Sequence, residues 1–442
     1  MNTKTLTKHR DMPKLKIPQR WVRKGKRKLR DWLLKPIPRS FRHKLVRSQL
    51  TLDYDPPKEL TLKIANTLEE LEAAYHLLYR SYIAMGYMKP DDSKMRVTFY
   101  HLLPSTTTLI AKWKGEVVGT VSIFRDNSEG LPLESEFKID HLRNDGKVVA
   151  EISSLAVAPH FRNQQGKILL PLLKFLWLYS KHYFGLDYMV MATHPKMADF
   201  FEGILLFDLL QKETVNKYDF ANGCPAIAGA LDLNRAPDLY SAQYGKKPDH
   251  KNLYKFMTSL EHMTRNISLP LRDVSKISDP VLNPQILNEV LNKKPDLVNS
   301  LTSKQMRILL NHYGDDVYRD NVAEIRFLYD KVPTEDLRKG GPRFDVRCPG
   351  QLMVPFQKEG RRVEIRDLSQ TGVKIFSNET LEVNKVYQLY VALSEFNVVP
   401  LVVKAAWQDD NGYYGMSVVR ESKKWNAILE ELENQLPHKL AS

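Results

Sequence analysis

Six short apolar segments follow one another between residues 350 and 419, and their spacing strongly limits the fold. Within each segment apolar side chains alternate with polar ones or run together, and turn-forming residues separate neighbouring segments. A series of short strands with short connections predicts a small antiparallel β-barrel. The segments are Gly350–Pro355, Arg361–Arg366, Val373–Ser377, Val386–Ser394, Val398–Trp407 and Gly412–Val419.

Upstream of these segments, helical and strand patterns alternate. Thr67 and Glu70 have the spacing of a capping box, and apolar side chains follow at helical intervals. Two strand patterns, Thr106–Trp113 and Glu116–Arg125, flank a Lys-Gly turn and predict a hairpin. The order of elements predicts an α+β domain in which helices flank a mixed sheet. Later patterns predict strands at Lys147–Val157 and Leu186–Thr193, a helical block from Ile168 to Phe184, and a helix at Lys196–Phe207.

Between the two patterns lies a more polar stretch without repeats. Helical spacing recurs in it at Leu282–Leu291, Ser303–Tyr313 and Val322–Tyr329, so we expect a helical connector. The chain then divides into five parts: a basic arm at 1–55, the sheet domain at 56–235, the connector at 236–335, the barrel at 336–430 and a tail at 431–442.

The positive charge of the chain is concentrated in the arm. The net charge is +14, and residues 1–50 hold 17 Lys and Arg against two acids, Asp11 and Asp31. The rest of the chain is therefore close to neutral, which argues against a nucleic-acid-binding core. Trp and Leu side chains lie between the cations of Arg20–Arg47, a composition suited to an anionic membrane surface. The alternative is a solvated tail or a helix packed on the sheet domain.

Membrane-spanning, secreted and metal-binding classes find no support in the sequence. No stretch of 18 or more uncharged apolar residues occurs, and the N-terminus lacks the pattern of a signal peptide. Cys224 and Cys348 lie far apart and form no metal-binding pattern, so we expect reduced thiols and no metal. The expected location is the cytoplasm, with the arm as a peripheral contact to the inner face of the membrane.

Two arginines four residues apart, Arg343 and Arg347, precede a turn of sequence Asp367-Leu-Ser369-Gln-Thr-Gly372. Paired guanidiniums on an irregular segment can clamp phosphate or stack on a purine. The acid and the hydroxyl of the turn can hydrogen-bond a base edge and a ribose. The combination resembles the PilZ family of bacterial receptor domains, which implies that these five residues bind cyclic di-GMP. The alternative is a barrel of the same shape that has lost its ligand.

One acid interrupts the strand Glu151-Ile-Ser153-Ser-Leu155-Ala-Val157. A lone carboxylate among apolar neighbours is costly unless it is paired or used, and alternation places Glu151, Ser153 and Leu155 on one face. This strand and the hairpin resemble the GNAT acyltransferases, in which backbone N–H groups polarise a thioester carbonyl and a base takes a proton from an amine. The resemblance implies catalytic work for Glu151 and Ser153; the alternatives are a salt bridge and a strand hydrogen bond.

The loop after this strand departs from the GNAT pattern. In that family R-x-x-G-x-G/A binds the pyrophosphate of coenzyme A through backbone amides at a helix start. The present loop runs from Arg162 to Lys167, with Gln165 and Lys167 at the two glycine positions. This departure favours a donor without the adenosine diphosphate, such as acyl carrier protein.

A narrower likeness involves Leu78-Tyr-Arg80-Ser-Tyr82 together with the Glu151 strand. These segments resemble the long-chain N-acyl amino acid synthases, relatives of the acyl-homoserine-lactone synthases. The likeness implies that a fatty acyl group moves from acyl carrier protein, or from acyl-CoA, to an amine. It also implies that Arg80 belongs to the catalytic set, for which a surface ion pair is the alternative. We expect the acyl donor to contact Leu155, Val157, Arg162 and Lys167.

The sequence thus predicts a cyclic di-GMP-responsive N-acyltransferase that moves a long-chain acyl group from acyl carrier protein to an amine such as an amino acid. Ligand binding at the barrel would reorient it against the acyltransferase through the connector. Two other hypotheses stay open. One is a non-catalytic cyclic di-GMP receptor whose GNAT-like part only docks a partner, and the other is an acetyl-CoA-dependent N-acetyltransferase.

Overall fold

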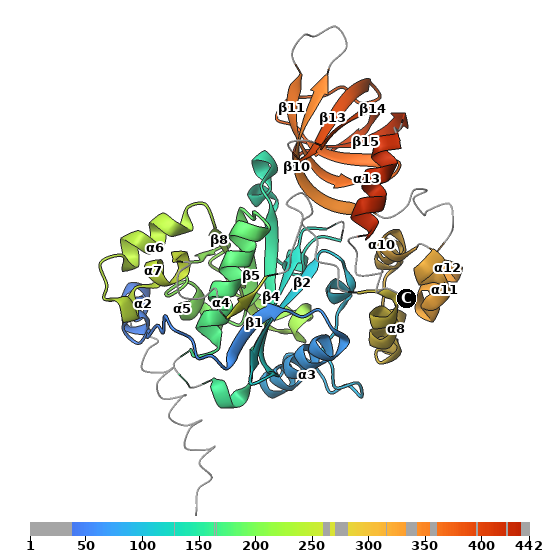
Figure 1. Cartoon of the computed structure of the whole chain (residues 1–442). Coiled ribbons are helices and arrows are strands. Elements are labelled where there is room, and N and C mark those ends of the chain that lie inside the picture. Colours follow the sequence, from blue (N-terminus) through green and yellow to red (C-terminus); the bar gives the residue numbers. More distant parts are fainter. Residues whose placement is uncertain are drawn as a thin grey trace, which may run out of the picture.

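A computed structural model describes most of the chain beyond the arm. The described residues are 38–127, 129–162, 164, 166–259, 266–269, 282–314, 316–332, 343–353, 360–394, 397–420 and 423–434. A broad twisted sheet with helices on both faces forms the larger body, and a barrel stands on one end of it (Figure 1). The arm at residues 1–37 lies outside the described residues. The α+β fold class with a GNAT-like mixed sheet and a small antiparallel barrel is confirmed.

The larger body is built on a nine-stranded mixed sheet in the described part of the chain. The strand order is β6-β8-β5-β4-β3-β2-β1-β9, and β7 pairs with β8. The pairs β4–β5 and β1–β9 are parallel, and the other neighbours are antiparallel. The strands are β1 Leu60–Ile64, β2 Thr106–Trp113, β3 Glu116–Arg125, β4 Val149–Val157, β5 Tyr188–Thr193, β6 Asp208–Leu209, β7 Val215–Tyr218, β8 Cys224–Asp232 and β9 Ile267–Ser268.

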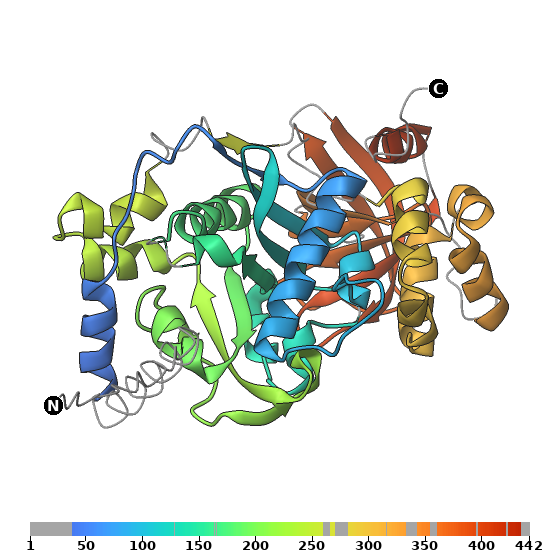
Figure 2. The same ribbon diagram turned by 90° about the horizontal axis from the view of Figure 1, so that it is seen from below.

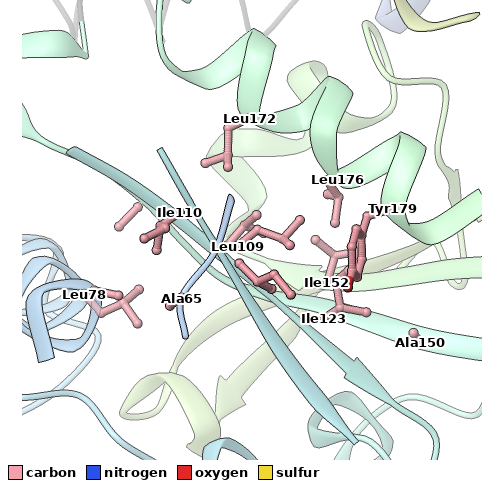
Figure 3. Packing of buried hydrophobic residues seen from close by; sticks show 14 of the residues in the cluster. Ala65, Leu78, Leu109, Ile110, Ile123, Ala150, Ile152, Leu172, Leu176 and Tyr179 are labelled. Carbon is pink, nitrogen blue, oxygen red and sulfur yellow. The ribbon is translucent and has the colours of Figure 1, made fainter. Parts of the chain in front are cut away.

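Two helices cover opposite faces of the central strands. Helix α3, Leu68–Met85, begins where Thr67 accepts a hydrogen bond from the Glu70 N–H, and ends at Gly86 with a left-handed φ of +80°. Helix α4, Leu169–Leu178, lies on the other face and continues into a π-helical turn at Tyr179–Tyr183. Figure 3 shows Leu78 of α3 on one side of the strands and Leu172, Leu176 and Tyr179 on the other. The predicted hairpin and the helical blocks are confirmed.

The helix predicted at Lys196–Phe207 is wrong in length. The structure has only α5, Ala198–Phe201, after a short turn at Pro195–Met197. Leu206 has a left-handed φ of +58°, a conformation that ends a helix. The apolar residues beyond α5 are buried all the same, because the chain folds back onto the sheet there.

Three further helices lie on the side of the sheet that α4 covers, and α7 packs directly on α4. They are α2 Arg39–Ser48, α6 Ala236–Tyr244 and α7 Leu253–Thr258. Helix α2 is the only part of the basic arm that the structure describes as a helix. It packs on α5, where the Arg42 guanidinium lies 2.9 Å from a carboxylate oxygen of Asp199. The alternative of a helix packed on the sheet domain therefore holds for this segment.

From residue 282 on, the expected connector is a compact helical layer, whereas α6 and α7, in its first part, pack beside α4. The layer comprises α8 Pro284–Asn292, α9 Pro295–Asn299, α10 Ser303–Tyr313, α11 Asp316–Asn321 and α12 Ala323–Lys331. The Tyr313 hydroxyl donates to the Leu102 carbonyl at 2.7 Å, and Lys293 pairs with Glu72 of α3. Figure 2 shows these helices, in gold, beside α3, in blue. The layer therefore packs on the sheet domain and is more than a linker.

The C-terminal part is a closed six-stranded barrel of order β10-β11-β12-β15-β14-β13. All its neighbouring strands are antiparallel, and its interior is filled by apolar side chains such as Val346, Leu389 and Val403. The six predicted segments fall on its six strands. The strands are β10 Phe344–Met353, β11 Arg361–Leu368, β12 Gly372–Phe376, β13 Val386–Ser394, β14 Asn397–Gln408 and β15 Tyr413–Arg420.

A final helix, α13 Lys423–Asn434, belongs to the barrel and was not predicted. Trp425 is fully buried, and Ile428, Leu429 and Leu432 join the same apolar core. This i, i+3, i+4, i+7 spacing was a helical signal in the sequence. The barrel domain therefore continues past the expected boundary at residue 430.

Candidate active site and candidate nucleotide site

A cavity of about 330 Å³ opens where β4 and β5 separate. The two strands pair only as far as Glu151 and Val190, and beyond that point the sheet is split. Backbone groups on this edge of β4 therefore face the cavity instead of a neighbouring strand. Apolar side chains from α4 and β5 form much of its wall, among them Leu173, Leu176, Trp177, Met189 and Met191.

Glu151 lies on β4 at this cavity and is 1% exposed. One carboxylate oxygen accepts a hydrogen bond from the Leu133 N–H at 2.8 Å. Burial, helped by the negative charge of Glu134 and opposed by the Leu133 N–H, raises the pKa of Glu151 to about 8. A carboxyl group with such a pKa can exchange protons near neutral pH, as a general base must.

The strand that carries Glu151 contains a β-bulge. Ser153 pairs with Ser122, yet Ala156 pairs with Thr120, so Ser154 and Leu155 together oppose one residue of β3. Ser154 has a left-handed φ of +55°. Side chains of directly paired residues lie on the same face of the sheet. Ala156 pairs with Thr120, which shares a face with Phe124, the partner of Glu151. The bulge therefore places Ala156 on the face of Glu151 and Leu155 on the opposite face. The expectation from alternation that Leu155 shares the face of Glu151 is wrong for this reason.

Several residues of the predicted site meet at the cavity. Glu151, Ser153, Leu155, Val157 and Arg162 all line it. The Arg162 guanidinium donates to the Val157 carbonyl at 2.7 Å and to the Ser81 hydroxyl at 2.8 Å, and burial lowers its pKa. Arg162 therefore ties the end of β4 to α3 at the rim of the cavity.

Two residues of the predicted site lie elsewhere. Arg80 is exposed on α3 and lines a separate depression with Glu70 and Lys112, so the structure does not bring it to the cavity. The Lys167 ammonium lies 4.3 Å from the Trp113 ring centroid, beside a smaller hollow that Asp53 and Gly166 also line. Helical spacing alone could not distinguish the two sides of α3, because the cavity touches only its last turn.

The structure adds two residues that the sequence did not single out. The Tyr218 hydroxyl is buried at the cavity without a hydrogen-bond partner among the described residues, and burial near Glu151 raises its pKa. The buried Arg96 guanidinium lies 4.1 Å from the ring centroid of Tyr82 and donates to the Phe220 carbonyl at 2.9 Å. Tyr82 and Phe220 both line the cavity. No motif marks these residues; only the fold brings them together.

The predicted nucleotide site is partly assembled on the barrel. Arg343, just before β10, pairs with Asp367 at 3.0 Å. The buried Ser369 hydroxyl donates to the Gly372 carbonyl at 3.1 Å, which closes the turn. A side chain at position 372 would come within 3.2 Å of the Arg343 guanidinium, so glycine keeps this approach open. Four of the five predicted residues thus lie close together.

Arg347 lies apart from this group and faces the sheet domain. It is inside strand β10, at a register shift, and not on the irregular segment expected for both arginines. Its guanidinium bonds to Glu364 and to the backbone carbonyl of Gly185. Gly185 lies in the turn between the end of α4 and the start of β5. Side chains of both α4 and β5 line the cavity. One arginine of the motif is therefore part of the contact between the two domains.

Other contacts join the barrel to the same end of the sheet. Arg366 of β11 donates to the Gly146 carbonyl, three residues before β4 begins. The Phe376 ring lies directly over Gly146, where a Cβ atom would come within 2.6 Å of the ring carbons. Arg125, the last residue of β3, lies 3.9 Å from Asp345. The barrel therefore contacts the end of β3 and the segment just before β4, and these are the two strands that pair at the bulge.

Two further observations on the described residues concern metal ions and membranes. No group of three or more His, Cys, Asp and Glu side chains is arranged to hold a metal ion there. None of the helices described is both long and apolar enough to cross a bilayer.

Comparison with protein families separates the chain into the same two bodies. Residues 73–232 match the family model of the N-acyl amino acid synthase FeeM, and residues 337–433 match the PilZ domain. The chain joins an acyltransferase domain that resembles FeeM to a domain that resembles PilZ. Both predicted resemblances are thereby confirmed, and the sheet domain is an acyltransferase.

Solved structures with similar folds include FeeM, an N-acyl amino acid synthase from uncultured soil microbes. It is 24% identical, covers 40% of this chain and 93% of its own, and gives a TM-score of 0.35. The CoA-dependent acyl-homoserine lactone synthase BjaI is 14% identical over 49% of this chain and 96% of its own, with a TM-score of 0.33. The acetyltransferase yncA from Salmonella typhimurium is 17% identical over 40% and 95%, with a TM-score of 0.30. No match was found among curated proteins.

Proposed function

We propose that the chain is an N-acyltransferase controlled by cyclic di-GMP, which transfers a long-chain acyl group from acyl carrier protein to an amine such as an amino acid. The observation that carries this proposal is the buried Glu151 at the apolar cavity between β4 and β5. An acid with a pKa of about 8 at the split of the sheet is suited to deprotonate an amine beside a bound thioester.

The proposed reaction uses the residues of β4. The amine nitrogen attacks the thioester carbonyl, and backbone N–H groups on the free edge of β4 stabilise the oxyanion. Glu151 takes a proton from the nitrogen. The carbon–sulfur bond then breaks, the amide forms, and the proton passes to the departing thiolate. The buried Tyr218 hydroxyl and Ser153 both line the cavity, where they would hydrogen-bond the reactants.

The cavity favours a long acyl chain over an acetyl group. Its walls are mostly aliphatic and aromatic side chains, and its volume is far more than an acetyl group needs. The wall extends from β4 to Tyr240 of α6 and Met257 of α7. An extended hydrocarbon chain would bury its surface along this wall, which is the usual source of affinity for an apolar ligand.

The loop before α4 favours acyl carrier protein as the donor. It has Gln165 and Lys167 at the two glycine positions, and the Lys167 ammonium already lies on the Trp113 ring. Asp53 lines the hollow beside this loop, and a carboxylate there would repel a diphosphate. The phosphopantetheine of a carrier protein has a single phosphate and does not need a full diphosphate site.

The donor can be tested with the purified chain. Amide formation should be at least about tenfold faster, in kcat/KM, with long-chain acyl carrier protein than with the matching acyl-CoA, a difference of about 1.4 kcal/mol in transition-state stabilisation. The reactions contain a mixture of amino acids, and the amide product is detected by mass spectrometry. Equal rates would remove the carrier protein from the proposal, and no amide from either donor would refute the acyl transfer itself.

Regulation would act through Arg347. A phosphate group of cyclic di-GMP is expected to recruit both arginines of the motif, as the PilZ resemblance implies. Arg347 cannot keep its bonds to Gly185 and Glu364 while it turns to a phosphate held by Arg343 and the Ser369 turn. Ligand binding and the docked barrel therefore compete for one guanidinium. This route is more direct than the connector, because it ends at the turn before β5 of the active site.

Competition of this kind predicts the effect of Gly146→Ala. The new methyl group would lie 2.6 Å from the Phe376 ring, and Gly146 has a left-handed φ of +67°, so the substitution weakens docking of the barrel. By linkage, a chain with a loosened barrel should bind cyclic di-GMP more tightly, by about fivefold or more. Titration calorimetry on the full chain measures this change.

Gly115→Ala is the matched control for that substitution. Gly115 has a φ of +89°, but nothing lies within 4 Å of the added Cβ, so it reproduces the backbone strain without touching the barrel. Its affinity for cyclic di-GMP should equal that of the unmodified chain. An unchanged or weakened affinity in Gly146→Ala, with the fold intact by circular dichroism, would contradict the competition.

A further inference from the structure

Ser154 adopts a backbone conformation that its side chain disfavours. Its φ of +55° lies in the left-handed region, which residues other than glycine rarely occupy. It is 2% exposed, in the middle of the catalytic strand and at the bulge that splits the sheet. Strained residues of this kind persist only when their surroundings hold them in place.

The buried His101 forms a hydrogen bond that keeps Ser154 in this conformation. His101 Nε2 lies 3.2 Å from the Ser154 hydroxyl, and His101 itself is 3% exposed. The Thr98 N–H donates to His101 Nδ1 at 3.2 Å, so Nδ1 is the acceptor and Nε2 carries the hydrogen. The Nε2–H group therefore donates to Ser154. Burial, together with the charge of Arg96, lowers the pKa of His101 to about 3, so the ring stays neutral across the working range of pH.

Aromatic packing fixes the orientation of the ring. The His101 ring stands edge-on to Tyr75 of α3, with centroids 5.4 Å apart, and to Phe124 of β3, with centroids 5.1 Å apart. Phe124 is the direct partner of Glu151 in the β3–β4 ladder. The histidine therefore lies on the face of the sheet that carries Glu151. Its hydrogen bond draws Ser154 to that face, where regular alternation would have placed it on the opposite one.

We propose that His101 is a positioning residue for acyl transfer: by holding Ser154 in the left-handed conformation, it maintains the bulge that sets the free edge of β4 against the thioester carbonyl. This inference rests on the acyl transfer proposed above. The bulge begins three residues after Glu151, where the β4–β5 ladder has ended. A regular strand there would shift the following N–H groups along the cavity wall, and an oxyanion needs donors at a fixed position.

Two substitutions at one position separate the backbone from the hydroxyl. Ser154→Ala removes the hydrogen-bond acceptor but keeps a Cβ atom that disfavours a positive φ. Ser154→Gly removes the same hydroxyl and accepts a positive φ without cost. We expect alanine to lower kcat about tenfold or more with little change in KM for the acyl donor, and glycine to keep kcat within about threefold of the unmodified chain.

His101→Ala completes the test as a double-mutant cycle. It should lower kcat about tenfold when residue 154 is serine, but only slightly when residue 154 is glycine, because glycine no longer needs the histidine. The cavity left by the lost ring is present in both backgrounds and therefore cancels. The inference is overturned if glycine and alanine at 154 are equally slow, if alanine is as fast as serine, or if His101→Ala costs the same in both backgrounds.

Unfolding measurements keep this inference distinct from the proposed reaction. Ser154→Ala should melt at a lower temperature than Ser154→Gly, because alanine cannot relieve the strained φ. If no variant, including the unmodified chain, forms amide, the proposed function fails, while melting temperatures still test the role of His101: His101→Ala should lower the melting temperature more when residue 154 is serine than when it is glycine. Equal melting temperatures for alanine and glycine at residue 154, or equal effects of His101→Ala in both backgrounds, would refute the proposal that His101 holds the bulge.

Discussion

Glutamine in place of Glu151 should lower the rate of amide formation about a hundredfold or more, the usual loss when a general base is removed. The side chain keeps its shape and can still receive the Leu133 N–H, so the cavity is preserved. Lipid extracts of cells that overproduce the chain, unmodified or with Glu151→Gln, should differ in amide-linked acyl products by mass spectrometry. Identical extracts would count against catalysis by Glu151.

The pH dependence of the rate gives an independent measure. Only ionised Glu151 can accept a proton, and burial raises its pKa to about 8, so kcat/KM for the unmodified chain should rise with pH up to about 8 and then level off. Residual activity of Glu151→Gln should lack this rise. A rise centred near the ordinary glutamate value of about 4.3 would place the base elsewhere.

Stability separates the loss of a base from the loss of the fold. Because the pKa of Glu151 is higher in the folded chain than in the unfolded chain, ionising it costs stability as pH increases toward 8. Glu151→Gln should therefore melt no lower than the unmodified chain at pH 8. Glu70→Gln is the contrasting control, because Glu70 is also buried but bonds to Lys63 and Lys112 at 2.9 and 2.7 Å. It should lose stability and keep its rate.

Alanine in place of Arg343 should weaken binding of cyclic di-GMP about 10- to 100-fold, because each hydrogen bond to a charged phosphate contributes on the order of 1.5–3 kcal/mol. Arg343 lies against Asp367 and the Gly372 turn, where the predicted ligand residues gather. Calorimetric titration of the full chain measures the change. Arg361→Ala is a matched control on the same barrel, because Arg361 pairs with Glu379 away from the motif.

Arg347→Ala should behave differently from Arg343→Ala. Under the proposed function it would remove a phosphate ligand but also free the turn at Gly185, so part of the lost affinity should be regained through easier undocking. The loss should therefore be smaller than for Arg343. Unchanged heat of binding in Arg343→Ala would show that the ligand lies elsewhere on the chain.

Patterns within short segments of the sequence predicted most of the fold. Alternation located the six barrel strands, and the β2–β3 hairpin has the bounds that its turn predicted. Glu151 could be singled out because one acid in an apolar strand is costly whatever the fold. These features depend on neighbours in the sequence, so the sequence alone was sufficient to find them.

The features that the sequence did not predict depend on tertiary contacts. The bulge at Ser154 needs His101, 53 positions away, and alternation alone assigned Leu155 to the wrong face. The sequence motif predicted the same role for Arg347 as for Arg343, but in the docked barrel the Arg347 guanidinium donates to the Gly185 carbonyl. Arg80 resembled a site residue by its motif, yet it lies on the outer side of its helix.

The late position of α13 has a consequence for the order in which the chain matures. The barrel core includes Trp425 and Leu429, which are synthesised after all six strands and after the whole acyltransferase domain. Domains fold largely as units and from the N-terminus during synthesis. The acyltransferase domain can therefore fold on the ribosome before the barrel has a complete interior, so, under the proposed function, activity would precede regulation in a newly made molecule.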